Sequence, residues 1–322
     1  MRNRLKGNLP LKLDSGVALI IAISFLGIFS LLGMYYVRSS EIELKRVNLL
    51  LDELRIREFV HAGLNEVVAE IEKHWTNGTI EDLLNRGEYE IGMPYYTFIN
   101  VGEGKQILSP SDVVRVALKV RVFDESGKIN INLAPASVIQ KLFGVNGEIA
   151  RNFKAKLDMQ SGGKWLYVLD EIFERGIPFD EELNVRINQN VSTWNAGDPS
   201  APIPYLNINK ATPEVLKALF NLSDSEVERV VSMKPFDSFE NFVGIIKKDP
   251  ISFNVKIGEL NGEKWFFPFT GKSSSFKIVL EGELRRGVSG VTYNRVKYSL
   301  EVGIVIVDGR AKKVWNRVLR ST

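Results

Sequence analysis

The chain begins with a short polar segment and then carries an uninterrupted apolar run. Val17 to Val37 are 21 consecutive residues without a charged side chain. At about 1.5 Å per residue, a helix of this length spans about 31 Å, which is enough to cross the hydrocarbon core of a bilayer. A cleaved secretory signal has a shorter apolar region, of about 7 to 15 residues. The run therefore predicts a transmembrane helix bounded by Val17 and Val37.

The residues after this run keep a helical pattern. From Glu41 to Lys73 there is one glycine and no proline, and apolar residues recur every three or four positions in two successive runs. These positions are Leu44, Val47, Leu51, Leu54, Val60, Leu64, Val67 and Ile71. The spacing predicts an amphipathic helix continuous with the membrane span, half in lipid and half packed on a folded domain. The charged residues of the opposite face, among them Asp52, are expected to be solvated.

The charges before the apolar run predict its orientation. Arg2, Arg4, Lys6 and Lys12 stand against a single acidic residue, Asp14. Cytoplasmic flanks of membrane helices carry an excess of Lys and Arg. We therefore expect a single-pass protein with a cytoplasmic N-terminus and with nearly all of the chain on the far side of the membrane.

Alternation of apolar and polar residues predicts strands on both sides of the middle of the chain. The strands are expected at Glu88–Val101, Val113–Phe123, Ser275–Arg285, Tyr293–Val307 and Val314–Leu319, with turns at Asp124–Gly127 and Arg286–Gly290. Alternation is typical of strands that bury one face. The segments are therefore expected to form one antiparallel, pilin-like sheet.

The middle of the chain, from about Ala134 to Pro250, has helical periodicity, and no strand is expected in it. An internal repeat lies here: the segment from Asn130 recurs 77 residues later at Asn207, with 7 of 15 positions identical. The shared positions are Asn130, Ile131, Asn132, Ala134, Val138, Leu142 and Phe143, matching Asn207, Ile208, Asn209, Ala211, Val215, Leu219 and Phe220. We predict an α+β protein in which a large all-α domain of two repeats is inserted into the sheet domain.

Each copy of the repeat ends an extended piece and starts a helix. Pro135 and Pro213 lie where a first-turn proline is tolerated, because its missing N–H would be unpaired anyway. Each helix is followed by a second one, so the copies resemble helix-hairpin-helix units. Nucleic-acid-binding forms use a glycine hairpin that lets backbone N–H groups approach a phosphate. Here Gly144-Val145-Asn146-Gly147 matches in part, whereas Asn221-Leu222-Ser223-Asp224 has no glycine and carries a carboxylate.

Composition excludes several function classes. The chain has no cysteine, so a disulfide, a thiolate metal site and a cysteine nucleophile are excluded. Its two histidines, His61 and His74, are expected to have ordinary structural roles on the long helix. The net charge of +3 argues against nucleic acid as a partner. We find no nucleophile–base pair, phosphate loop or metal-ligand set, so we expect no catalytic residues, no evident cofactor and no enzyme activity.

Ser15-Gly16 stands directly before the apolar run. This resembles a type IV prepilin leader, in which a membrane peptidase cuts after the glycine at the cytoplasmic face. The resemblance implies cleavage between Gly16 and Val17. Most members of that superfamily carry a glutamate at the fifth position of the mature chain, where this sequence has Ile21. That carboxylate is thought to pair with the N-terminal amine of a neighbouring subunit, so a subunit with Ile21 fits best at a filament end.

The ordered set of leader, long helix and split sheet with a duplicated insertion resembles the K-type minor pseudopilins of type II secretion. The most specific stretches are Asp124–Asn132 and Asn207–Leu216, and the resemblance covers most of the chain. It implies an inner-membrane subunit whose bulk is periplasmic and which primes and caps a pseudopilus for export of folded proteins. The implied partners are the minor pseudopilins I and J, other pseudopilins and the prepilin peptidase. Calcium binding is implied too, with no ligand assigned.

The expected organisation has five parts. They are a leader (1–16), a transmembrane and stalk helix (17–75), the first part of the sheet domain (76–132), an inserted helical domain (133–250) and the second part of the sheet domain (251–322). Two other functions stay open. A membrane-tethered DNA-uptake receptor would use the helix-hairpin-helix-like repeats. A minor pilin of a type IV pilus or competence system would share the leader and the long helix.

Overall fold

The structure is a computed structural model of the 322-residue chain. The residues that it describes are 15–92, 112–157, 166, 168–194, 206–246, 259–260, 263–264, 269–288 and 291–319. The chain divides into two compact units, Met1–Arg55 and Ile56–Thr322. Residues 1–14 of the predicted leader lie outside the described residues.

Helix α1 runs from Ser15 to Thr76 and contains the whole apolar run. This confirms the prediction of a long apolar N-terminal helix. In the first unit the large apolar side chains of Val17–Val37 are exposed, and the stripe residues Leu44, Val47, Leu51 and Leu54 are exposed as well. This part of the helix therefore presents apolar surface that the described residues of its own unit do not cover.

The prediction that Asp52 of this helix is solvated is wrong. Its side chain is fully buried and lies 3.6 Å from the Arg55 guanidinium, whereas we expected it on the solvated face. Asp52 precedes Ile56 and Val60 by four and eight residues, and both of these are buried. Residues at this spacing share one helix face, so Asp52 belongs to the buried stripe.

In the second unit, five strands form one antiparallel sheet in the order β1-β2-β9-β10-β11. The strands are β1 (Glu88–Gly92), β2 (Asp112–Asp124), β9 (Ser275–Val288), β10 (Val291–Val307) and β11 (Arg310–Leu319). The predicted antiparallel sheet is thereby confirmed, and residues 93–101 of its first predicted strand lie outside the described residues. β11 begins before the expected Val314. Asp308 and Gly309 both have positive φ, which permits a two-residue hairpin directly after β10.

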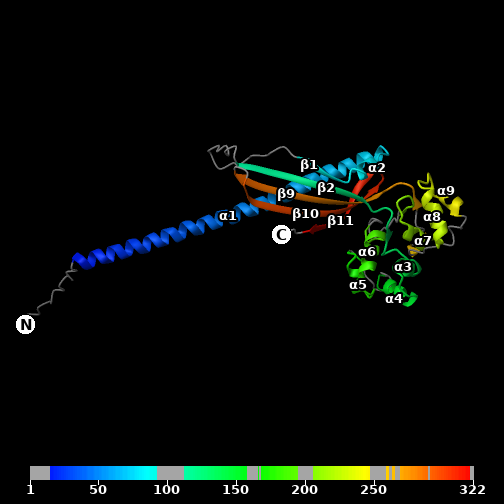
Figure 1. Cartoon of the computed structure of the whole chain (residues 1–322), viewed down its shortest axis with the longest axis horizontal. Helices are drawn as coiled ribbons and strands as arrows, with labels where there is room; N and C mark the ends of the chain where they lie inside the picture. Colours follow the sequence, from blue (N-terminus) through cyan, green and yellow to red (C-terminus); the bar gives the residue numbers. More distant parts are fainter. Residues whose placement is uncertain are drawn as a thin grey trace, which may run out of the picture. The chain divides into compact units, whose positions relative to one another are not determined.

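One face of this sheet packs against the second part of α1 (Figure 1). Val60, Leu64, Val67 and Ile71 are buried there, as the spacing predicted. Two glycines allow the helix and sheet to approach closely. A Cβ on Gly63 would fall 2.1 Å from Leu118 of β2, and one on Gly282 would fall 2.4 Å from Val60. At the end of α1, the short helix α2 (Ile80–Leu84) adds to this core.

Between β2 and β9 the described chain is mainly helical. The helices are α3 (Ala136–Phe143), α4 (Gly147–Leu157), α5 (Glu171–Glu174), α6 (Glu181–Asn190), α7 (Pro213–Phe220), α8 (Asp224–Ser232) and α9 (Phe239–Ile246). Figure 1 shows α3–α6 and α7–α9 as two neighbouring groups. Their hydrophobic cluster contains only residues from Ile129 to Ile246, and the cluster of α1, α2 and the sheet contains none of these. The two cores are therefore separate.

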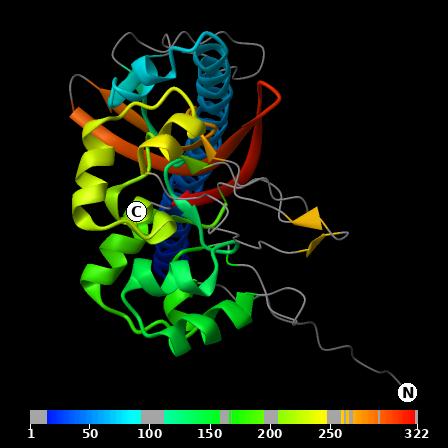
Figure 2. The same ribbon diagram turned by 90° about the vertical axis from the view of Figure 1, so that its right-hand side faces the viewer.

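Short parallel strands close each copy of the repeat. β3 (Ile129–Asn130) pairs with β4 (Val191–Ser192), and β5 (Leu206–Asn207) pairs with β8 (Phe269–Thr270). The expectation that residues 134–250 contain no strand is therefore wrong, because two-residue strands are too short to produce visible alternation. Figure 2 shows the helices of the first copy in green and those of the second in yellow. One further pair, β6 (Glu259–Leu260) with β7 (Glu263–Lys264), is antiparallel.

Candidate membrane anchor and binding groove

The first part of α1 is long and apolar enough to cross a membrane. A signal sequence near an N-terminus has the same length and composition. The one hydroxyl with a described hydrogen bond in this run is Ser24, whose Oγ donates to the carbonyl of Ile20 at 2.9 Å. Such a bond satisfies the hydroxyl within the helix, which is what an apolar surrounding requires.

The predicted cleavage position lies in the first turn of this helix. α1 begins at Ser15, so Gly16 and Val17 are helical, whereas a protease binds its substrate extended. The first four N–H groups of a helix have no partner within it, so unwinding the first turn breaks few hydrogen bonds. A Cβ on Gly16 would meet no atom within 4 Å. The side chain at this position is therefore not constrained by packing. Ile21 lies one turn further along and is 43% exposed.

The asparagines of the first repeat copy hold loops together. Asn130 Oδ1 accepts from the N–H of Asn132 at 3.0 Å. Asn132 Nδ2 donates to the carbonyl oxygens of Leu166 and Thr193, both at 3.0 Å. Asn132 Oδ1 accepts from the N–H of Leu166 at 2.7 Å. One buried amide thus joins the start of the copy to its middle and to its closing strand.

The second copy repeats this arrangement. Asn207 Oδ1 accepts from the N–H of Asn209 at 2.9 Å. Asn209 Nδ2 donates to the carbonyls of Phe236 at 3.0 Å and Gly271 at 3.3 Å, and its Oδ1 accepts from the N–H of Phe236 at 2.7 Å. The equivalent bonds give the Asn-Ile-Asn motifs a structural role. Ala134 and Ala211, also predicted as repeat positions, are buried in the helical core.

The turn after β2 connects the sheet to the helical region. Ser126 Oγ accepts from the N–H groups of Ser274 and Ser275, both at 2.9 Å, where the chain returns to the sheet. The carbonyl of Ser126 accepts from the N–H of Asn207 at 2.8 Å. Three segments therefore meet at Ser126: the chain that leaves the sheet, the chain that returns to it and the start of the second copy.

A partly buried carboxyl group, Asp124, and a buried one, Glu125, precede this serine. Asp124 accepts a hydrogen bond from the Ser273 hydroxyl, and Glu125 lies 2.8 Å from the Lys128 ammonium. Burial raises the pKa of both carboxyl groups above their ordinary values. The acidic start of the Asp124–Asn132 stretch thus belongs to a buried polar junction.

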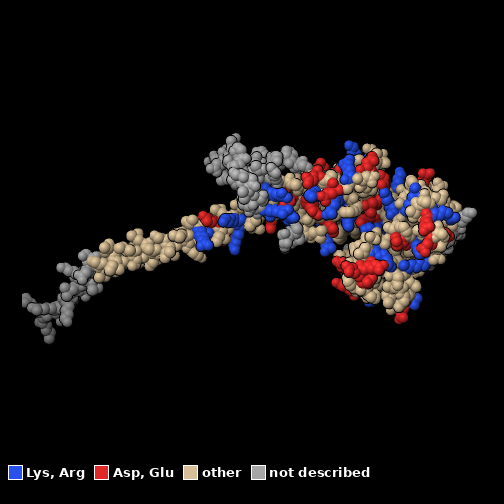
Figure 3. All heavy atoms as spheres, viewed as in Figure 1, with Lys and Arg blue, Asp and Glu red and all other residues tan. Residues whose placement is uncertain are grey.

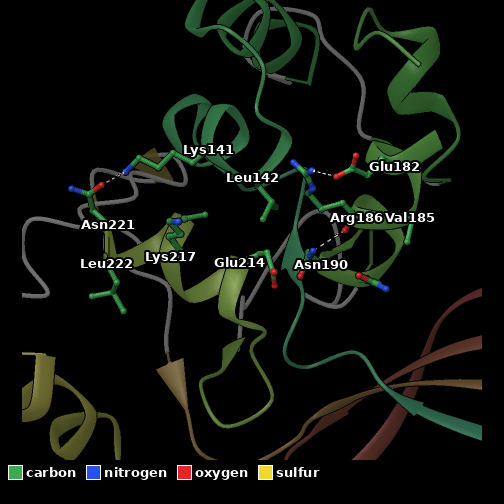
Figure 4. Close-up of a pocket in the computed structure, with 12 residues that line it drawn as sticks. Lys141, Leu142, Glu182, Val185, Arg186, Asn190, Glu214, Lys217, Asn221 and Leu222 are labelled. Carbon is green, nitrogen blue, oxygen red and sulfur yellow. Dashed lines mark hydrogen bonds and ion pairs between the residues drawn. The ribbon is translucent and has the colours of Figure 1, made fainter. Parts of the chain in front are cut away.

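A groove of about 680 Å³ lies between the two copies (Figure 4). Its walls come from α3 and α6 of the first copy and from α7 of the second. The lining residues are Lys141, Leu142, Glu182, Val185, Arg186, Gln189, Asn190, Glu214, Lys217, Ala218, Asn221 and Leu222. Concave sites of this volume are typical of ligand-binding pockets, although those are mostly apolar. This groove is mixed in charge.

The charged side chains of the groove are held by neighbours. Lys141 Nζ donates to Asn221 Oδ1 at 3.0 Å, and Arg186 lies 3.0 Å from the Glu182 carboxylate. Below them Asn190 Nδ2 donates to the carbonyl of Arg186 at 2.9 Å. Such a surface can hold an extended polar segment by hydrogen bonds. It has no nucleophile paired with a base in the part of the chain that the structure describes.

Comparison of the chain with models of known protein families and with curated protein sequences finds no match. Among the described residues, no group of three or more His, Asp or Glu side chains is placed to hold a metal ion. His61 lies 6.3 Å from the Tyr298 ring, measured between centroids. His74 Nδ1 lies 2.8 Å from the Thr79 hydroxyl. Both histidines therefore have local packing partners.

The sequence did not show which backbone groups form hydrogen bonds with the side chains of Asn132 and Asn209. It also did not predict the contact between the first copy and the sheet. Trp194 follows β4 and stacks on Trp315 of β11, with ring centroids 6.4 Å apart and an interplanar angle of 2°. A Cβ on Gly303 would fall 2.8 Å from the Trp194 ring. Neither tryptophan lies in a pattern that predicts its partner. Gly303, inside an alternating run, was the available signal, since a glycine within a strand can mark close approach by another group.

Proposed function

We propose that this chain is a K-type minor pseudopilin, a non-enzymatic subunit at the tip of a type II secretion pseudopilus. In this role it primes and caps the filament, which helps to export folded proteins across the outer membrane. The observation that carries the proposal is the division of α1. Its apolar first part is exposed, whereas Val60, Leu64, Val67 and Ile71 bury the second part against an antiparallel sheet. Pilin-type subunits combine a membrane helix and a sheet domain in this way.

The helical region between β2 and β9 supports a capping role. It has its own core and joins the sheet where α1 ends, because Trp75 Nε1 donates to the carbonyl of Ser273 at 2.8 Å. A second copy stacking on this end of the sheet domain would meet the helices. Ile21 supports the same position, because it cannot make the intramembrane charge pair that a glutamate makes with the next subunit.

This role predicts the location of the chain and its partners. The chain would be anchored in the inner membrane, with its N-terminus in the cytoplasm and its bulk in the periplasm. Its partners would be the minor pseudopilins I and J, whose helices would cover the exposed apolar part of α1. The prepilin peptidase would remove residues 1–16. Calcium stays an implied ligand without assigned residues.

Leader cleavage tests the proposal directly. The full chain is produced with and without a prepilin peptidase, and the N-terminus is read by intact-mass analysis. We expect a mature chain that begins at Val17. Gly16→Leu should stop cleavage without disturbing the fold, and Gly27→Leu is the matched control because neither glycine has an atom within 4 Å of its Cβ position. An intact Met1 form in the presence of active peptidase would contradict the proposal.

Assembly gives a second test, one that separates secretion from other pilin systems. The full chain is extracted in mild detergent with candidate partners I and J and purified through a tag on the chain. We expect a stable ternary complex, and excess chain should shorten pseudopili in cells. Binding to the minor pilins of a type IV pilus in place of I and J would favour the competence alternative.

The two helical hairpins keep a DNA-uptake receptor as the alternative from another class. Gly144 has φ of 67° between α3 and α4, as a close hairpin requires. In the second hairpin, however, Ser223 and Glu226 form a capping box that occupies the first N–H groups of α8, which leaves fewer donors for a phosphate. A gel shift of the full chain at low salt decides between the two, since phosphate-driven binding is strongest there. Binding that disappears in Lys141→Gln would favour the receptor.

A further inference from the structure

The face of the sheet that is turned away from α1, here called the outer face, carries charged residues on all five strands. Strand register places nine Lys or Arg residues with described side chains on it: Lys119, Arg121, Lys277, Arg285, Arg295, Lys297, Arg310, Lys312 and Arg317. Five acidic residues share the face: Glu88, Glu90, Glu281, Glu283 and Glu301. The excess of four positive charges is larger than the net charge of +3 of the whole chain. Positive charge is therefore concentrated on this face.

Two arginines of this face stand close together. Arg285 of β9 stands directly opposite Arg295 of β10. Like charges in directly opposed cross-strand positions destabilise a sheet. The pair therefore depends on a neighbouring carboxylate, and Glu283 supplies it.

The acidic residues of the face compensate only part of this charge. Glu283 accepts hydrogen bonds from both Arg285 and Arg295, and these bonds lower its pKa to about 2. Lys119 lies 2.8 Å from Glu88, and Arg121 lies 2.5 Å from Glu281. Three of the five carboxylates are thus already engaged by arginine or lysine.

Five cations remain, and one of them, Lys277, lies over the Phe123 ring, 5.1 Å from its centroid. The other four have no described partner. Within the described residues Lys297, Arg310, Lys312 and Arg317 make no ion pair, and all four are exposed. A groove of about 370 Å³ opens on the same face, and its charged lining residues are Lys119, Glu281, Glu283, Arg285, Arg295 and Lys297. Figure 3 shows basic side chains over this part of the molecule, with acidic ones between them.

We propose that the outer face of the sheet is a docking surface for an acidic, extended segment of a partner protein. Arg310 and Lys312 are alternate residues of β11 and stand about 6.6 Å apart on this face, with Arg317 further along the same strand, and alternate residues of an extended segment have the same spacing. Carboxylates on one side of such a segment can therefore reach successive cations. The proposal does not depend on the chain being a pseudopilin.

The test measures binding of a fluorescent poly-L-glutamate peptide to the full chain in nanodiscs of neutral lipid. The face variant combines Lys297→Gln, Lys312→Gln and Arg317→Gln, which break no described ion pair. The matched control combines Arg57→Gln, Lys73→Gln and Arg151→Gln, which remove the same charge from exposed positions on α1 and α4. Circular dichroism and thermal melting confirm that both variants fold like the wild type.

We expect the face variant to bind poly-L-glutamate roughly tenfold more weakly, since exposed charge pairs contribute modestly but act together here. The control should bind like the wild type, and affinity should fall as salt rises. Equal weakening in both variants would overturn the proposal. Loss of binding in nanodiscs that contain phosphatidylglycerol would assign the face to lipid head groups, and loss in inorganic phosphate at matched ionic strength would assign it to a small anion.

Discussion

Asn132 and Asn209 occupy equivalent positions and make equivalent bonds, although the loops that they hold share little sequence. Each side chain satisfies backbone groups from two distant segments. Buried amides of this kind specify which loops lie together, because a donor or acceptor left without a partner is costly. The duplication is therefore preserved most clearly in its hydrogen bonds.

Removing this amide gives the first prediction. We expect Asn132→Ala to lower the free energy of unfolding by about 2–4 kcal/mol, because three backbone groups lose their partner inside the protein. Urea denaturation of the full chain in detergent measures this. Asn65→Ala, at an exposed position on α1, should leave stability within about 0.5 kcal/mol. Similar small effects for both variants would contradict a structural role for the motif.

The turn after Asp124 requires glycine at position 127, because backbone from another segment lies close to it. A Cβ there would fall 2.3 Å from the carbonyl oxygen of Lys210 and 2.8 Å from the nitrogen of Ala211. Backbone cannot move aside as a flexible side chain can, so we expect Gly127→Ala to cost about 1–3 kcal/mol of stability. In Gly244→Ala the new Cβ would meet no atom within 4 Å, and this helical control should be neutral or slightly stabilising. Thermal melting compares the two variants.

Glu283 makes a prediction about pH. Its two arginine partners lower its pKa from 4.5 to about 2 in the folded chain. Because the folded pKa lies below the unfolded one, the carboxylate stabilises the fold above about pH 4.5, and this contribution is lost as the pH falls toward 2. The wild type should therefore lose stability relative to Glu283→Gln within that window. If the difference in unfolding free energy between the wild type and Glu283→Gln stays constant across this pH window, the arginine contacts do not form in solution.

At the scale of elements, α1 is one helix with two kinds of surface. Leu64 is 6% exposed against the sheet, whereas Leu51 is 41% exposed. They belong to two runs of three-and-four spacing, which the six-residue step from Leu54 to Val60 separates. Periodicity identifies a face but does not say what covers it, because protein, lipid and another helix all accept leucine.

Paired substitutions distinguish these surfaces. We expect Leu64→Ala to cost about 2–5 kcal/mol by opening a cavity in the core. Leu51→Ala should change the stability of the isolated chain by less than about 0.5 kcal/mol. If other pseudopilins cover the exposed stripe, Leu51→Ala should nevertheless reduce co-purification with I and J. Unchanged complex formation would place the partner interface elsewhere.

At the scale of the whole molecule, the described residues form two hydrophobic cores, which meet at the Ser126 junction and where Trp194 stacks on Trp315. The first core is built only from the helical region, and the second is built from α1, α2 and the sheet. At the junction Ser126 Oγ lies 2.9 Å from the N–H nitrogen of Ser274, so the outgoing and returning chains are adjacent. The helical region can therefore be removed without separating β2 from β9.

Excision tests this independence. Residues 127–273 are deleted and a short glycine linker joins Ser126 to Ser274. We expect the remaining chain to retain hydrogen-exchange protection in β9 and β10, while the helical signal in circular dichroism falls. Loss of protection in those strands would show that the two cores are not separable. If the helices cap a filament, cells with the deleted form should make longer pseudopili than cells with the full chain.

The sequence by itself determined the features that depend on local pattern. An uncharged run from Val17 to Val37 is helical because a membrane-length apolar segment satisfies its backbone internally. Three further features could be predicted, because each leaves a regular spacing or a repeated motif in the chain. They are the apolar stripe through Val60 and Ile71, the alternating strands and the duplicated Asn-Ile-Asn motif.

Only the tertiary structure decided which distant segments meet. It buried Asp52, formed the two-residue strands β3, β4, β5 and β8, and brought Trp194 onto Gly303. It also placed Arg285 and Arg295 of neighbouring strands at one level of the outer face. These features leave no period in the sequence. They depend on hydrogen bonds and contacts between residues far apart in the chain, whose pairing is settled only when the whole fold satisfies its buried groups together.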